Sequence, residues 1–312
     1  MSKIGKDVLI NLLHTNAGNE VARKSISHDT VIKFGRTVSD YMISAEKYYT
    51  GKPDGKFFTS AEFGDDVVNA KKAYITINTL MGGETAELNR FNEGKKQLPG
   101  LITPLGLTKI VDMVVLLFAF ANTGEAITYE TVRACRQSEI SETKDGEFVM
   151  VDALASTTKL SIEEIMNLGY GDKNHLAICR YHFHTGAVAL DMEKFGTDYL
   201  KPEEKEVLLL TGNKLQAKCL GYDDRYRGKD GEPALMYDVD VYEPDAFYWN
   251  LDEGDDNETL RAKVLDNDTV GKVRAFYEAL NVDGDFPEMP NGYKEWKHNF
   301  QKLIFSELNK IF

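Results

Sequence analysis

The chain has 312 residues, of which 42% are hydrophobic and 28% are charged, a composition typical of a globular protein. Its formal net charge of -13 at pH 7 disfavours a broad contact with a nucleic-acid backbone, and leaves only a local basic groove for such a partner. The three cysteines, Cys135, Cys179 and Cys219, lie far apart and lack metal-ligand spacing, so we expect reduced thiols and no metal.

The first 20 residues lack the long apolar core and the small-residue cleavage site of a secretory signal peptide. The longest apolar run, residues 113–121, is too short to span a bilayer and is interpreted as part of a buried helix. We therefore expect no membrane partner, and either a cytoplasmic location or delivery into a host cell without a classical signal peptide.

Helical patterns occupy the first third of the chain. Residues 1–90 mix charged and apolar residues at helical spacing, and residues 98–106 form a turn-rich connector. The connector leads into an apolar helix predicted over 107–121, which should end near Asn122.

The middle of the chain is rich in β-branched and aromatic residues, which favour strands. A short helix over 161–169 interrupts them, because Ser161 and Glu164 have the spacing of a capping box. Residues 223–233 are polar and predict a loop. The predicted strands are 126–135, 147–156, 175–186, 187–192, 206–212, 214–221 and 234–243.

Helical spacing returns after Pro244, with helices predicted over 260–280 and 293–312. The order of helices, short strands and helices predicts the α+β class. The corresponding divisions are a helical N-terminal region (1–90), a catalytic core (91–245) and a helical C-terminal extension (246–312).

Three polar motifs lie on or at the ends of predicted strands. Arg133 lies within one strand, Ser156-Thr157-Thr158 ends another, and Glu204-Lys205-Glu206 precedes an apolar strand. Taken singly, a strand arginine is usually a surface residue, S-T-T is usually a turn or cap, and E-x-E is common by chance. Their order and their local structure make them informative together.

This arrangement resembles the arginine–serine–glutamate class of mono-ADP-ribosyltransferases, a family of bacterial exotoxins, injected effectors and phage-encoded modifying enzymes. The resemblance spans residues 107–243 and implies a core of two packed, mainly antiparallel β-sheets with helical flanks. Val132-Arg133-Ala134 replaces the Tyr-Arg-Gly of the family, which leaves Arg136 as an alternative to Arg133. Ser-Thr-Thr replaces Ser-Thr-Ser.

The resemblance also implies that NAD is the substrate and is split at its nicotinamide–ribose bond. The guanidinium of Arg133 suits the pyrophosphate and ribose oxygens, because it forks onto oxygens with fixed geometry and permanent charge. The family pattern assigns Glu206 to the oxocarbenium-like transition state and Ser156 to holding Glu206. Thr157 and Thr158 join these residues as NAD-binding candidates.

Glu204 is the candidate for orienting or activating the acceptor. On a strand it would lie on the same face as Glu206, about 6.6 Å away. A glutamate at this position implies transfer to an arginine side chain of a target protein, with Tyr199 as a further substrate contact. Two alternatives stay open: an NAD glycohydrolase or nucleic-acid ADP-ribosyltransferase, and a catalytically inactive binding module with the same fold.

Overall fold

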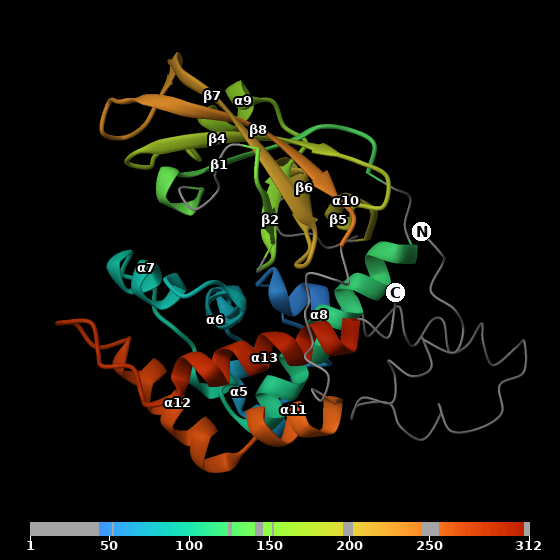
Figure 1. Cartoon of the computed structure of the whole chain (residues 1–312), viewed down its shortest axis with the longest axis vertical. Coiled ribbons are helices and arrows are strands. Elements are labelled where there is room, and N and C mark those ends of the chain that lie inside the picture. The colour runs from blue at the N-terminus through green and yellow to red at the C-terminus, as the bar shows by residue number, and fades with distance from the viewer. Residues whose placement is uncertain are drawn as a thin grey trace, which may run out of the picture. The chain divides into compact units, whose positions relative to one another are not determined.

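The computed structural model describes residues 44–51, 53–123, 127–140, 146–151, 153–195, 202–244 and 256–308. These residues fall into two compact units (Figure 1). One unit is helical and combines the described residues up to Thr123 with those from Asp256 onward. The other contains the β-sheet and lies between them in the sequence.

The helical unit contains a helical segment at residues 44–49 and the helices that follow it in the chain. Helices α6 and α8 pack against the C-terminal helix α13. The elements are α4 (Ser60–Phe63), α5 (Asp65–Val68), α6 (Ala73–Met81), α7 (Ala86–Asn92), η1 (Pro99–Leu101), α8 (Pro104–Thr123), α11 (Asn257–Val264), α12 (Asn267–Ala279) and α13 (Tyr293–Leu308).

The helix predicted over 260–280 is two helices, α11 and α12. The carboxylate of Asp266 caps the second one, because its Oδ2 accepts a hydrogen bond from the Thr269 amide at 2.9 Å. An aspartate at this position favours a helix start over a helix interior. The apolar pattern alone did not reveal the break.

Helix α8 lies with the helical unit, whereas the sequence-based division placed residues 91–123 in the catalytic core. Its side chains Ile110, Val114 and Leu117 are fully buried, and the helix packs against α13. No helix in the described part of the chain has the length and apolar character needed to cross a membrane.

A buried ion pair ties three helices of this unit together. The Lys297 ammonium on α13 lies 2.6 Å from Oε1 of Glu87 on α7, and the two side chains are 7% and 1% exposed. Tyr293 and Tyr277 also donate hydrogen bonds to this oxygen, at 2.5 and 3.2 Å. The second oxygen, Oε2, has no hydrogen-bond partner among the described residues.

The other unit contains one mixed, mainly antiparallel sheet in the order β2-β7-β8-β4-β1-β3-β6-β5. Among the pairings between described residues, only β4 with β8 is parallel. This confirms the predicted α+β class. The strands are β1 (Thr131–Arg136), β2 (Phe148–Met150), β3 (Ala155–Thr158), β4 (Leu176–Phe183), β5 (Ala189–Asp191), β6 (Glu206–Leu209), β7 (Lys214–Arg227) and β8 (Pro233–Tyr242).

The sheet consists of a five-stranded part and a three-stranded part that meet between β1 and β3. These two strands pair at one position, Val132 with Thr158, whereas β1 pairs with β4 along its whole length. Because one pairing constrains two strands only weakly, β1 and β3 are free to diverge on either side of it. The predicted site motifs lie on both sides of this junction.

Both faces of the sheet are covered by apolar side chains. The two faces of β1 contribute to different apolar clusters: Cys135 belongs to one that contains Cys179 and Val207, whereas Val132 belongs to one that contains Ile165 of α9 (Ile162–Asn167). The predicted capping box of α9 is confirmed, because Ser161 Oγ accepts from the Glu164 amide and the Glu164 carboxylate accepts from the Ser161 amide.

The strand predicted over 147–156 is divided between opposite ends of the sheet. Its first part is β2, which pairs with β7 at one edge, and its last part is β3, which pairs with β6 near the other edge. Local composition favours an extended chain throughout. The tertiary structure decides that the segment crosses from one end of the sheet to the other.

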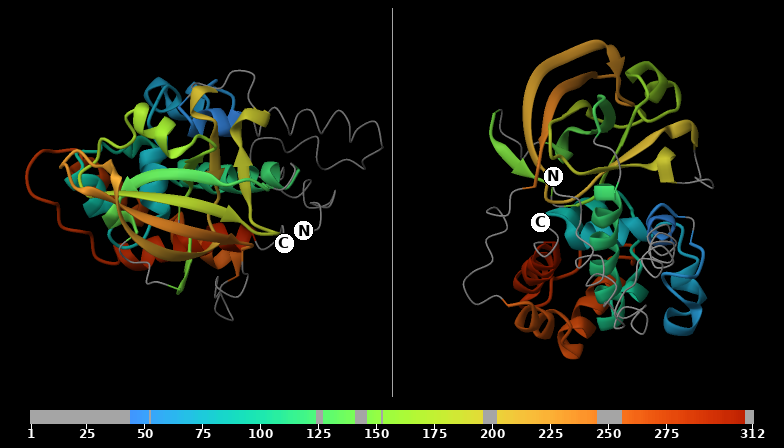
Figure 2. Two further views of the ribbon diagram at one scale, coloured as in Figure 1. Left: turned by 90° about the horizontal axis from the view of Figure 1, so that it is seen from above. Right: turned by 90° about the vertical axis from the view of Figure 1, so that its right-hand side faces the viewer.

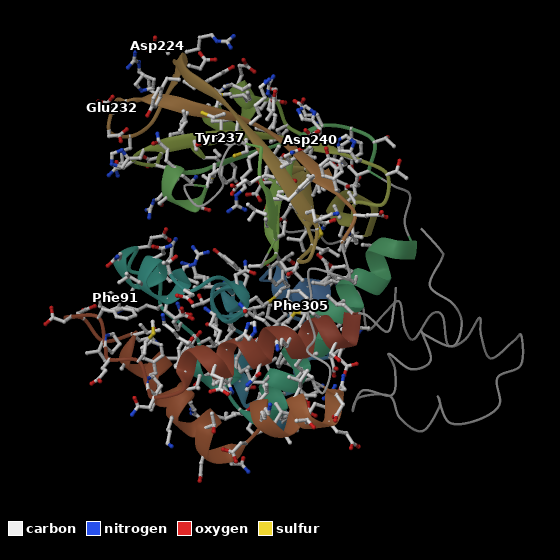
Figure 3. All side chains as sticks on the ribbon, in the orientation of Figure 1. Phe91, Asp224, Glu232, Tyr237, Asp240 and Phe305 are labelled. Atoms are coloured by element: carbon white, nitrogen blue, oxygen red, sulfur yellow. The ribbon has the colours of Figure 1, made fainter. Side chains whose placement is uncertain are left out.

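The loop predicted over 223–233 is wrong for about half of its length, because β7 continues to Arg227 and pairs with β8 through two register shifts, which leaves 228–232 between the two strands. Strands β7 and β8 together form a long ribbon, whose curvature is visible in Figure 2. Asp224 and Glu232 lie near its far end in Figure 3. Residues 223–233 are mostly exposed, so the polar sequence that indicated a loop is compatible with a strand.

Candidate active site

The three predicted motifs lie on neighbouring strands. Arg133 is on β1, Ser156 to Thr158 form most of β3, and Glu206 is the first residue of β6. Val132 pairs with Thr158, and Thr158 pairs with Glu206, so one row of residues crosses all three strands. The structure therefore places the three motifs on adjacent strands, although 73 positions separate Arg133 from Glu206 in the sequence (206 − 133 = 73). Arg133 is the neighbour of Val132 in β1, so it lies on the face of that strand opposite to this row.

Arg133 lies at the junction between the two parts of the sheet. Its Nη1 donates a hydrogen bond to the Ser156 carbonyl at 3.2 Å, and its Nη2 lies 2.7 Å from Oε2 of Glu139. Its side chain is 27% exposed. Burial by itself lowers the pKa of the Arg133 guanidinium, but the Glu139 carboxylate outweighs this effect and raises that pKa above its ordinary value.

Arg136, the alternative to Arg133 for binding NAD, is the last residue of β1. It pairs with Leu176 of β4, away from the position where β1 meets β3. Its amide donates a hydrogen bond to Oε1 of Glu139 at 3.0 Å. Because Arg133 is the arginine that contacts Ser156, the geometry favours it over Arg136.

The Ser-Thr-Thr hydroxyls do not have equivalent surroundings. Ser156 is exposed, whereas Thr157 is 2% exposed and donates its hydroxyl to the Val207 carbonyl at 2.8 Å. Ser156 and Thr158 lie on the face of β3 opposite to Thr157. Thr157 therefore supports the sheet, and its hydroxyl is not presented to a ligand.

Thr158 connects β3 to the segment that carries the two glutamates. Its hydroxyl donates to the Glu204 carbonyl and accepts from the Leu160 amide at 3.0 Å. The next residue, Lys159, donates its amide to the Lys205 carbonyl at 3.1 Å. The end of β3 thus fixes the main chain around Glu204 and Lys205.

The expectation that Glu204 and Glu206 share one strand face is wrong. Glu204 ends the 3₁₀ turn η3 (Pro202–Glu204), and β6 begins only at Glu206. Between them Lys205 has φ of 46°, in the left-handed region that breaks the alternation of a strand. Both glutamates are half-buried, and they belong to different local structures.

Two residues with direct contacts to the predicted motifs were not identified from the sequence. The Tyr170 hydroxyl donates a hydrogen bond to Oε1 of Glu204, and Glu139 pairs with Arg133. No sequence pattern connects Tyr170 to Glu204, because 34 positions separate them. Glu139, six positions after Arg133, gave no signal beyond its charge.

A second polar network supports the exit of β3. The Lys159 ammonium lies 3.0 Å from Oδ1 of Asp191 on β5, and the Tyr129 hydroxyl donates to Oδ2 of Asp191 at 2.6 Å. The Asp191 side chain is only 3% exposed. Burial and the neighbouring carboxylates raise the pKa of Tyr129 above its ordinary value, so its hydroxyl stays a hydrogen-bond donor.

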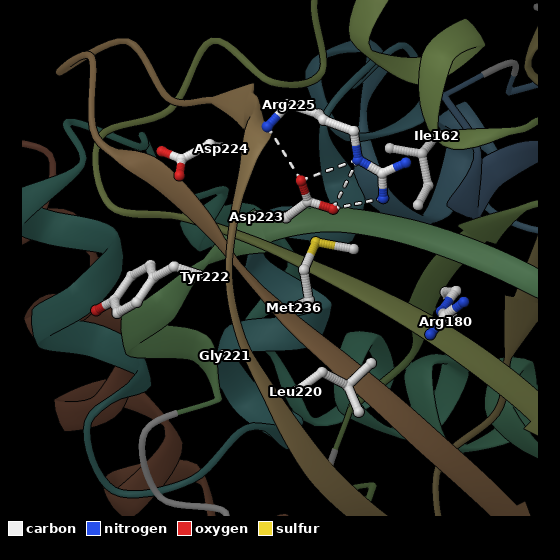
Figure 4. Close-up of a pocket in the computed structure, with 9 residues that line it drawn as sticks. All are labelled: Ile162, Arg180, Leu220, Gly221, Tyr222, Asp223, Asp224, Arg225 and Met236. Carbon is white, nitrogen blue, oxygen red and sulfur yellow. Dashed lines mark hydrogen bonds and ion pairs between the residues drawn. The ribbon is translucent and has the colours of Figure 1, made fainter.

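A pocket with a volume of about 510 Å³ lies in the sheet unit, but none of the predicted site residues lines it (Figure 4). Its walls come from the β7–β8 ribbon, β4 and α9, and its charged side chains form ion pairs such as Arg225 with Asp223 at 2.7 Å. Tyr199 lies outside the described residues. Among the described residues, no group of three or more His, Cys, Asp or Glu side chains could hold a metal ion.

No family model matches the chain. A search of curated proteins also finds no match. Among solved structures, the chain is similar to the ADP-ribosyltransferase Vis from Vibrio splendidus, in a structure with agmatine (10% identity, TM-score 0.37, 72% of this chain and 89% of that chain).

Two further solved structures match the chain with comparable identities and TM-scores. C3stau2 from S. aureus, solved with NAD, matches at 13% identity and a TM-score of 0.37, over 71% of this chain and 98% of that chain. Plx2a, an ADP-ribosyltransferase toxin from Paenibacillus larvae, matches at 12% identity and a TM-score of 0.32, over 69% of this chain and 96% of that chain. Because these TM-scores lie below 0.5, we base the proposed function on the residues of this chain.

Proposed function

We propose that the chain transfers ADP-ribose from NAD to an arginine side chain of a target protein. One observation supports the proposal: three neighbouring strands carry a permanently charged guanidinium, an exposed hydroxyl and a half-buried carboxylate, on Arg133, Ser156 and Glu206, and the guanidinium contacts the Ser156 main chain. These are the groups needed to hold an anionic dinucleotide and to stabilise a developing cation at its ribose.

In this proposal Arg133 binds pyrophosphate or ribose oxygens of NAD. Its side chain is partly exposed and therefore accessible. An anionic ligand would displace the Glu139 carboxylate from the guanidinium or share the guanidinium with it. Ser156 presents its hydroxyl on the same strand face as Thr158, which pairs with Glu206. That position allows Ser156 to donate a hydrogen bond that fixes the Glu206 carboxylate.

Glu206 acts on the bond that breaks. As the C1′–nitrogen bond of NAD opens, nicotinamide leaves with the bonding electron pair and positive charge spreads over C1′ and the ring oxygen of the ribose. A preorganised carboxylate stabilises this charge more than it stabilises the uncharged ribose of the ground state.

Glu204 acts on the bond that forms. A guanidinium nitrogen of the acceptor attacks C1′, and the proton that it loses passes to a base, for which the Glu204 carboxylate is the candidate. The turn that holds Glu204 sets it apart from the strand that begins at Glu206, which suits two carboxylates with different roles.

The proposal is tested with NAD as substrate and agmatine, a small guanidine, as acceptor. Replacing Glu206 by glutamine should lower NAD cleavage at least about 100-fold, because a single electrostatic contributor of this kind supplies roughly 2.7–4 kcal/mol. The matched control is Glu203→Gln, an exposed glutamate of the turn η3 before β6, which should leave cleavage within about twofold of wild type. Wild-type cleavage in Glu206→Gln would contradict the proposal.

Glu204→Gln distinguishes transfer from hydrolysis. Transfer to agmatine should fall, whereas NAD cleavage without an acceptor should largely persist, because Glu204 acts on the acceptor. An equal loss of both activities would refute this division of roles. A wild-type chain that cleaves NAD without modifying agmatine or any protein in a lysate would be an NAD glycohydrolase instead.

A further inference from the structure

We propose that Tyr170 is a positioning residue that orients the carboxylate of Glu204 toward the acceptor; this inference rests on the proposed function. The Tyr170 hydroxyl donates a hydrogen bond to Oε1 of Glu204. Tyr170 follows α9 in the segment between β3 and β4, whereas Glu204 ends the turn η3 before β6. The bond thus joins two segments of the chain that only the fold brings together.

The main chain of Glu204 is held independently of Tyr170. The Thr158 hydroxyl donates to the Glu204 carbonyl, and the Lys159 amide donates to the Lys205 carbonyl at 3.1 Å. Both bonds hold the backbone that directly follows the Glu204 Cα. Neither bond involves the Glu204 carboxylate, which accepts the hydrogen bond from Tyr170.

Tyr170 itself is held firmly enough to serve as a fixed donor. Its amide donates to the Ile165 carbonyl at 3.1 Å, and its ring packs against the apolar cluster that contains Ile165. The Lys173 ammonium lies 5.9 Å from the centre of the ring and donates a hydrogen bond to the Tyr170 carbonyl. Backbone, ring and carbonyl are therefore each anchored.

A carboxylate accepts up to about four hydrogen bonds, and the bond from Tyr170 takes one of these positions. Holding one oxygen reduces the range of orientations that the planar carboxylate can take. An arginine guanidinium prefers carboxylates in a defined planar arrangement, so a fixed carboxylate reduces the ordering required when the acceptor binds. We expect Tyr170 to affect the transfer step and to leave NAD binding unchanged.

The test is Tyr170→Phe, which removes one hydroxyl and keeps the packed ring. The rate of transfer to agmatine at saturating NAD should fall about tenfold, because a hydrogen bond to a charged group stabilises more than one between two neutral groups. NAD cleavage without acceptor and the KM for NAD should stay within about twofold of wild type. In the Glu204→Gln background, Tyr170→Phe should cause no further loss of transfer.

The matched control is Tyr226→Phe. Tyr226 also donates its hydroxyl to a glutamate, Oε1 of Glu163 on α9, at 2.6 Å, but this bond lies on a contact between α9 and β7. Its loss should leave transfer within about twofold of wild type, which separates the role of Tyr170 from general support of α9.

Two results for Tyr170→Phe would overturn the inference while leaving the proposed function intact: unchanged transfer, or an equal fall in transfer and NAD cleavage. The second result would mean that Tyr170 acts through the fold. A further loss in the Glu204→Gln background would overturn it as well, because Tyr170 would then act on another group. A wild-type chain without any NAD cleavage would overturn the proposed function and this inference together.

Discussion

Replacing Glu139 by glutamine should strengthen NAD binding. Oε2 of Glu139 lies 2.7 Å from Nη2 of Arg133, so it occupies the guanidinium that we assign to the pyrophosphate or ribose of NAD. The two side chains are 27% and 35% exposed, and a pair with such solvent access contributes no more than about 1 kcal/mol. Removing this competition should therefore lower the Kd for NAD about fivefold, because about 1.4 kcal/mol corresponds to a factor of ten.

Titration calorimetry with NAD measures this change. The experiment is done in the Glu206→Gln background, so that NAD is not consumed, and at one fixed ionic strength. Glu164→Gln serves as the control: it removes an equal charge from α9, and glutamine preserves the bond from the Ser161 amide. The control should leave the Kd unchanged. A weaker affinity in Glu139→Gln would refute the reasoning, since Glu139 would then hold Arg133 in its binding position.

The remaining predictions concern stability and the turn between the two glutamates. Lys297→Met leaves the Glu87 carboxylate buried without its cation and should lower the free energy of unfolding by about 3–5 kcal/mol in urea denaturation. Adding Glu87→Gln should restore most of this loss, and the absence of any restoration would argue against the ion pair as its cause. Lys205→Gly should retain transfer activity, because φ of 46° suits glycine, whereas Lys205→Val should lower stability by about 1 kcal/mol and reduce transfer. Equal activity of these two variants would contradict a role for this backbone geometry.

Local patterns predicted the elements that depend on nearby residues. The capping box of Ser161 and Glu164 marks the start of α9, since its hydrogen bonds join residues three positions apart. Alternation at Asp238 and Val239 reflects the two faces of β8. The order of the three motifs and the α+β class could also be predicted, because they need only the type and sequence of elements.

Long-range pairing decided what the local patterns did not. The segment 147–156 has strand character throughout, yet its two parts pair with strands at opposite ends of the sheet. The turn before β6 removes Glu204 from the strand, because hydrogen bonds from Thr158 and Lys159 stabilise a left-handed Lys205 between the glutamates.

The sequence by itself determined which chemical groups are present and in what order: a guanidinium, three hydroxyls and two carboxylates on or beside strands. Only the tertiary structure decided which of them meet. It placed β1, β3 and β6 side by side, gave Arg133 the partners Ser156 and Glu139, and gave Glu204 the partner Tyr170. Sequence periodicity indicates which face of an element is apolar. Contacts between distant segments depend instead on which strands pair their backbone hydrogen bonds and which faces of the sheet become buried.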